Sequence, residues 1–187
     1  MNPFAEIIVI LIDLYITIIL FRFFLQYFRA DFYNPVSQFV VKATDFFIRP
    51  LRRVIPGFGG IDVSSLVFAY VVVLLKLLFI FVVSSQFNIG VLFLLLYSVT
   101  DLLLSILKLF MYMILILVVI SWISPGTHSP IVQVIAQVAE PVIRKFRGWL
   151  PPMEGFDFSP LVASLFLFFV SQSIKYWIVP IIMRISM

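Results

Sequence analysis

Ionisable side chains interrupt the apolar runs of this sequence, and they are the first candidates for chemistry. The set consists of Asp13, Lys76, Lys108 and Lys175. A charge inside a membrane is costly, and it often marks a path for ions or protons. Two structural roles remain open beside transport. A lysine can extend its amine to the membrane surface, and an Asp13–Lys108 pair could simply join two helices.

Distances along the predicted helices place these charges at related depths. Asp13 and Lys108 each lie 15 residues before the end of an apolar run, or about 22 Å from the membrane boundary at that end. Lys76 and Lys175 lie roughly 18 and 24 Å from the same boundary, and Asp101 about two turns further out. We therefore predict a charged layer in the half of the membrane away from that boundary. Arg22, near the boundary, is expected to extend its side chain to the surface.

A second set of charged residues is basic and falls in two stretches of the chain. It comprises Arg49, Arg52, Arg53, Arg144, Lys145 and Arg147. Guanidinium and ammonium groups bind phosphate and carboxylate through charge-assisted hydrogen bonds. We predict that these residues bind anionic lipid headgroups or a membrane partner.

Composition restricts the kind of protein that carries these residues. Of 187 residues, 63% are hydrophobic and 12% charged, with a mean hydropathy of +1.18, more than one soluble core can bury. The chain has no cysteine, which excludes disulfides and thiolate chemistry. Its only histidine, His128, is a weak candidate for a metal or haem ligand. We find no catalytic motif and expect no enzyme activity, metal, cofactor or nucleic-acid partner.

Four apolar segments are long enough to span a membrane as helices. They run over about 4–28, 64–86, 94–123 and 159–183. The first has no basic leader region or cleavage site, so we expect it to be retained. The sequence thus predicts an all-α integral membrane protein.

The segment Asn34–Leu66 recurs 95 residues later as Ser129–Leu161. Ten of the 33 aligned positions are identical, which indicates a tandem duplication. Each copy belongs to a unit with two spans, so both units enter the membrane in the same direction. We predict two parallel repeats, residues 1–88 and 89–187.

Each repeat carries an amphipathic helix between its spans, at 34–55 and 129–150. Polar residues recur every three or four positions in both, which places them on one face. Pro50 and Pro141 are expected to kink or split the helices. The apolar faces could lie in lipid or pack on the spans, and both alternatives remain open.

A proline- and glycine-rich turn and an Asp-x-Ser motif follow the amphipathic helix of each repeat. Because Pro160 suits the first turn of a helix, we predict Ser159, and by the repeat Ser64, as helix N-caps. Asp62 and Asp157 would then lie just outside a helix N-terminus, where a carboxylate is favoured. From there they could reach Arg52 and Arg147. The whole device would return the chain to the membrane.

Lysine and arginine are concentrated in the two inserts, whereas the other side offers little beyond Arg184. Because basic residues are enriched in cytoplasmic loops, we predict cytoplasmic inserts with both termini outside.

The doubled segment resembles the bacterial YggT family over nearly the whole chain. The resemblance is carried by NPVSQFVVKATDFFIRPLRRVIPGFGGIDVSSL, by SPIVQVIAQVAEPVIRKFRGWLPPMEGFDFSPL, and by FRFFLQYFRADFYNP ahead of the first copy. The second copy has Gly148 where the first has Arg53, which predicts weaker basic function there. The resemblance implies a small accessory protein of the bacterial inner membrane, with relatives linked to osmotic or salt tolerance, cation uptake, division or cytochrome assembly.

Two functions are consistent with these features. We favour an assembly or scaffold factor whose inserts bind anionic lipid or a membrane-protein partner, with self-association left open. The alternative is an ion or proton transport component that uses Asp13, Lys76, Lys108 and Lys175.

Overall fold

The structure, a computed structural model, describes residues 2–85, 90–124, 126, 129–148 and 157–186. Its helices are α1 (Pro3–Tyr27), α2 (Pro35–Val54), α3 (Val63–Val83), α4 (Val91–Ile123), α5 (Pro130–Arg147) and α6 (Ser159–Ser173), continued by the π-helix η1 (Ile174–Ile178) and α7 (Val179–Ser186). Within this described part, four helical segments are long and apolar enough to cross a membrane: α1, α3, α4 and the run Ser159–Ile185. The predicted all-α, four-span fold is confirmed. His128 and the turn of the second repeat lie outside the described residues.

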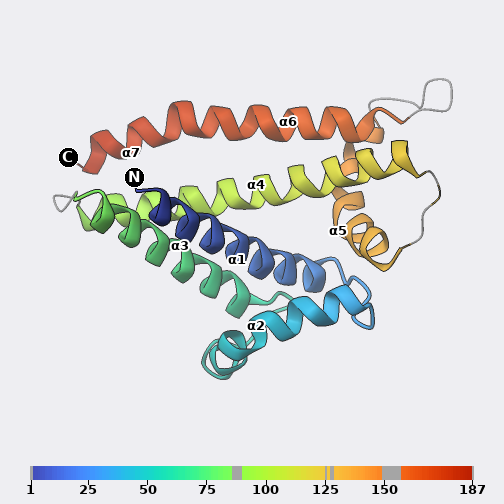
Figure 1. Ribbon diagram of the computed structural model, residues 1–187, viewed down its shortest axis with the longest axis horizontal. Helices are drawn as coiled ribbons and strands as arrows, with labels where there is room; N and C mark the ends of the chain where they lie inside the picture. The colour runs from blue at the N-terminus through green and yellow to red at the C-terminus, as the bar shows by residue number, and fades with distance from the viewer. Residues whose placement is uncertain (1, 86–89, 125, 127–128, 149–156, 187) are drawn as a thin grey trace.

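Each repeat pairs its own two spans, α1 with α3 and α4 with α6, and α4 also contacts α1 and α3 across the repeats (Figure 1). Branched side chains such as Ile16, Val73 and Ile114 are fully buried, and Ala69 allows close approach of the helices. The rings of Phe24 and Phe110 meet edge to face with centroids 4.8 Å apart. One core therefore joins the two repeats.

The inserts α2 and α5 contact each other near their N-terminal ends. The Asn34 side-chain amide donates to the Pro130 carbonyl over 2.9 Å, and the Asp31 backbone N–H donates to the Gln137 side chain over 2.8 Å. Figure 1 shows both chain termini together at the other end of the molecule. The N-terminal ends of the two inserts thus meet, which is consistent with the predicted parallel repeats.

Both inserts begin with the same chemistry. The side chains of Asn34 and Ser129 accept hydrogen bonds from the first turns of α2 and α5, and a proline occupies the first helical position of each. Pro50 and Pro141 lie inside the helices, which continue through them. Of the kink or split predicted at these prolines, the split does not occur, because a single missing N–H does not end the helix.

The N-cap of α3 corrects another prediction. Asp62, not Ser64, is the cap, and its carboxylate accepts from the backbone N–H of Ser65. Ser64 is inside the helix and donates its hydroxyl to the Ile55 carbonyl over 2.6 Å. Similarly, Ser159 is the first residue of α6 rather than its cap, and its N–H donates to Asp157 over 2.9 Å. Asp62 takes the capping position of α3, whereas Asp157 lies one residue before Phe158, the N-cap of α6. In both repeats the aspartate carboxylate accepts from a free N–H of the first helical turn.

Thiol labelling tests the shared side of the inserts, since the chain has no native cysteine. We expect cysteines replacing exposed Phe58 and Lys145 to react with an impermeant reagent from the same side of sealed membranes. A cysteine replacing Arg184 should react only from the other side. Labelling of Phe58→Cys and Lys145→Cys from opposite sides would contradict the arrangement.

Candidate functional site

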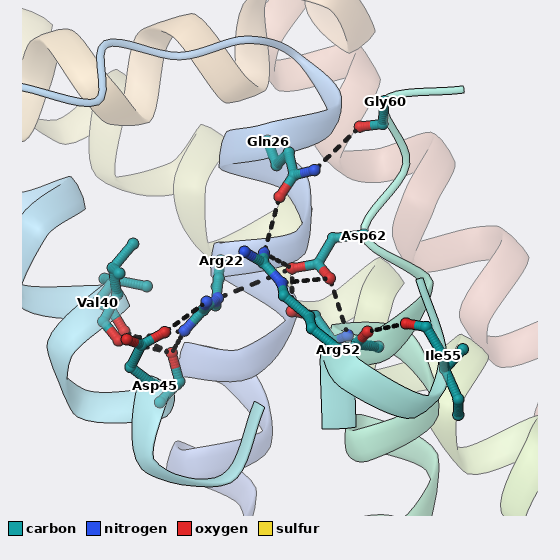
Figure 2. Close-up of polar contacts among 12 residues, drawn as sticks. Arg22, Gln26, Val40, Asp45, Arg52, Ile55, Gly60 and Asp62 are labelled. Atoms are coloured by element: carbon teal, nitrogen blue, oxygen red, sulfur yellow. Dashed lines mark hydrogen bonds and ion pairs between the residues drawn. The ribbon is translucent and has the colours of Figure 1, made fainter. Parts of the chain in front are cut away.

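Arg22 of α1 is the centre of a polar network that connects the first span to the first insert (Figure 2). Its side chain is 4% exposed. One terminal nitrogen donates to the Val41 carbonyl over 3.1 Å and to the Thr44 hydroxyl over 2.7 Å, and the other donates to Asp45 over 2.9 Å. Its Nε lies 3.8 Å from Asp62. The prediction that Arg22 extends to the surface is therefore wrong, since α2 covers it and supplies its partners.

Asp62 joins this network to the start of α3. Its side chain is 1% exposed. Arg52 binds both carboxylate oxygens, at 2.5 and 3.3 Å, and the Ser65 hydroxyl and N–H also donate to it. Burial alone would raise the pKa of Asp62, but the hydrogen bonds from Arg52 and Ser65 outweigh burial and hold this pKa below its usual value. The carboxylate is thus charged and shared between two arginines.

Gln26 extends the network to the glycine turn, as Figure 2 shows. Its side-chain oxygen accepts from Arg52 over 2.9 Å, and its nitrogen donates to the Gly60 carbonyl over 3.2 Å. Gly59 and Gly60 have φ of 60° and 84°, a region that side chains disfavour. The turn therefore needs glycine to present this carbonyl. Arg52, which we predicted to bind lipid, instead connects α2 to Gln26 of α1 and to Asp62 at the start of α3.

The second repeat has a simpler and more open version of this clamp. Arg147 binds Asp157 over 2.9 and 3.0 Å and Glu140 over 2.5 Å, and these side chains are 36 to 45% exposed. Burial acts to raise the pKa of Asp157, but hydrogen bonds from Ser159 and Arg147 lower it below its usual value. The predicted contacts Arg52–Asp62 and Arg147–Asp157 are both present.

The other four predicted lipid-binding residues lie on the surface. They are Arg49, Arg53, Arg144 and Lys145, all exposed, and the ion pairs among the described residues include none of them. Arg49 and Arg53 flank an open hollow of about 450 Å³ together with Phe46, Pro50 and Asp45.

The apolar faces of the two inserts differ sharply. In α2, Phe39, Phe46 and Val54 are 65, 80 and 80% exposed, whereas Ser37, Val40, Thr44 and Ile48 face the protein. In α5 the apolar residues Val134, Ile135, Val138, Ala139, Ile143 and Phe146 are buried. Protein therefore covers most of the apolar face of α5, apart from Ile131 in its first turn, and leaves much of that of α2 open.

The four predicted intramembrane residues do converge. Asp13, Lys76, Lys108 and Lys175 all line one cavity of about 270 Å³ between the spans. Asp101, Ser105 and Tyr112 of α4 and Ser171 and Gln172 of α6 complete its polar lining. The cavity lies away from the inserts, so the membrane-embedded charges form a second, separate candidate site.

Lys76, rather than Lys108, is the partner of Asp13. The Lys76 amine is 2.8 Å from Asp13 and also forms an ion pair with Asp101. The depths estimated from the insert side placed Asp101 too far from Lys76 for a contact. The short link between α3 and α4 predicts the pair better, because Lys76 and Asp101 lie at similar distances along the two helices from this link. Lys108 instead lies 5.9 Å from the centre of the Tyr112 ring.

Removal of the Asp62 charge should destabilise the protein far more than removal of its counterpart. Asp62→Asn removes a carboxylate that is 1% exposed and that Arg22 shares with Arg52, and it leaves Asp45 as the only carboxylate beside Arg22 among the described residues. We expect a loss of about 3 kcal/mol. Asp157→Asn breaks an exposed clamp and should cost less than about 1 kcal/mol. Thermal unfolding in detergent measures both, and equal losses would contradict the assigned difference in burial.

The lowered pKa of Asp62 also predicts acid sensitivity. Its stabilising effect is complete above its unfolded value of 3.8 and is lost as the pH falls through the lower folded value. The unfolding temperature of the wild type should therefore fall more steeply below about pH 4 than that of Asp62→Asn. Parallel pH curves for the two proteins would contradict this assignment.

Comparison with known proteins places the fold in a family. The family model described as CCB3/YggT matches residues 1–83 and 91–178. The chain is 43% identical to an uncharacterized protein of Pseudomonas aeruginosa over 83% of this chain and 79% of the relative. It is 39% identical to the uncharacterized protein YggT of Escherichia coli K12, over 93 and 90%. A Vibrio alginolyticus protein is 41% identical over 91 and 92%.

No solved structure matches the chain. The family match covers both repeats, and each relative is aligned over most of its length. This protein therefore belongs to the CCB3/YggT family of membrane proteins.

Proposed function

We propose that this multi-pass protein is a non-enzymatic assembly or scaffold factor that binds anionic lipid at the membrane surface through α2. The observation that carries the proposal is the open apolar face of α2 beside arginines that have no carboxylate partner among the described residues. Such a helix lies in the interface, with its apolar side in the acyl boundary and its cations near lipid phosphates.

The arrangement of residues along α2 supports this orientation. One face contacts the protein through Val40, Thr44 and Ile48, and the Arg22 network holds it there. Phe39, Phe46 and Val54 form a neighbouring apolar face. Arg49 and Arg53 project beside Phe46 at the hollow. Because Arg52 is engaged within the chain, we narrow the proposed lipid ligands of this insert to Arg49 and Arg53.

We propose the bacterial inner membrane as the location, with cytoplasmic inserts and external termini. The support is the concentration of lysine and arginine in the inserts and the shared side on which α2 and α5 lie. The inner leaflet carries anionic lipid that would attract the open cations of α2. A membrane-protein partner held on that surface would account for a scaffold role.

Ion or proton transport is the second candidate, because the membrane-embedded charges line a common cavity. Ion flux in reconstituted vesicles separates the two. If Asp13→Asn and Lys108→Met abolish flux and salt tolerance while Arg49→Gln with Arg53→Gln changes neither, transport replaces the scaffold proposal.

Lipid preference tests the α2 assignment directly. The full chain in nanodiscs should gather phosphatidylglycerol over phosphatidylcholine, measured by energy transfer from a fluorophore at Phe46→Cys to labelled lipid. The double variant Arg49→Gln, Arg53→Gln should lose about 2 kcal/mol of this preference, because each cation near an anionic surface contributes about 1 kcal/mol.

The second repeat provides the matched control. Arg144→Gln with Lys145→Gln removes the same charge from α5, whose apolar face is covered by protein. We expect little change at the α2 fluorophore. An equal loss in both double variants would show a general charge effect and would reject α2 as the lipid-binding helix.

A further inference from the structure

We propose that the membrane-embedded cavity is a binding site for a phosphate-bearing anion, held by Lys108 of α4 and Lys175 of η1. The phosphate would belong either to a lipid headgroup or to free phosphate. The cavity lies away from α2 and its ligand contacts different residues, so this inference is independent of the proposed scaffold function.

The charges around the cavity favour an anion over a cation. Lys76 is 5% exposed and bridges Asp13 and Asp101, so both carboxylates of the cavity lining are already engaged. The ion pairs of the described chain leave Lys108 and Lys175 without a carboxylate. The lining therefore carries three lysines against two aspartates, and an entering anion would meet the two amines that remain.

The repeat explains how this excess arises. The 95-residue offset that relates the inserts also relates Asp13 to Lys108 and Lys76 to Ser171, and all four side chains line the cavity. The first repeat places a carboxylate and a lysine there as a pair. At the two equivalent positions the second repeat has Lys108 and Ser171, so it has no counterpart of the Asp13–Lys76 ion pair. A bound anion would supply the negative charge that Lys108 lacks.

The π-helix η1 positions the second cation. The helix formed by α6 and η1 turns Phe168, Ser171, Gln172 and Lys175 toward the cavity, and Lys175 is within the π turn Ile174–Ile178. Such turns are rare and often occur at functional sites. Lysine amines, with the Gln172 amide and the Tyr112 hydroxyl, are donors suited to phosphate oxygens.

Two binding measurements on the full chain distinguish the sources. In nanodiscs containing phosphatidylglycerol, native mass spectrometry should detect retained phosphatidylglycerol if the ligand is a headgroup. In nanodiscs of phosphatidylcholine alone, equilibrium dialysis with radiolabelled inorganic phosphate should show saturable binding if the ligand is free phosphate. Lys108→Met and Lys175→Met should each reduce the binding roughly tenfold, because a charge-assisted hydrogen bond is lost.

Three variants serve as controls. Arg184→Met removes a cation near the termini but outside the cavity lining and should leave binding unchanged. Lys108→Arg keeps the charge and should retain binding, so it separates loss of the charge from any other effect of changing this residue. Arg49→Gln with Arg53→Gln should also retain binding, so failure of the α2 proposal is distinguishable. The inference would be overturned if neither phosphatidylglycerol nor inorganic phosphate bound, or if Arg184→Met reduced binding as much as Lys108→Met.

Discussion

The contact of Arg22 with α2 and Asp62 is the constraint on which the first repeat depends. An arginine that is 4% exposed must be surrounded by acceptors, because an unpaired charge there would cost several kcal/mol. Asp45 and the Thr44 and Val41 oxygens come from α2, and Asp62 comes from the start of α3. Satisfying one side chain thus fixes the insert against the first span and sets the point where the chain re-enters the membrane.

The two repeats share a backbone plan but have separated in their chemistry. The first has the buried Arg22–Asp62–Arg52 network and an insert with an open apolar face. The second has an exposed clamp around Arg147 and an insert whose apolar face is packed on the protein. Within the membrane the first repeat has Asp13, which is paired with Lys76, whereas the second repeat has Lys108 at the equivalent position.

Much of the fold was predictable, because hydropathy, the duplicated segment and the Asn-Pro and Ser-Pro helix starts each report a local property. The pairing of Arg52 with Asp62 was also predictable, since the turn brings close residues together. The burial of Arg22 could not be predicted, because it depends on the tertiary packing of α2 over this side chain. Asp101 was missed because the depth was measured from the insert side, whereas Lys76 and Asp101 meet across the opposite hairpin. Which insert exposes its apolar face depends on packing against α4 and α6, which periodicity does not reveal.

The depth of α2 in the membrane decides whether this helix lies at the lipid surface. Spin labels placed singly along the helix at Phe39, Lys42, Phe46, Arg49 and Arg53 report accessibility to oxygen and to a water-soluble nickel complex. We expect a shallow helix parallel to the surface, with labels at Phe39 and Phe46 more accessible to oxygen and labels at Lys42 and Arg49 more accessible to nickel. Depth that changes steadily along the helix, or water access at every position, would contradict it.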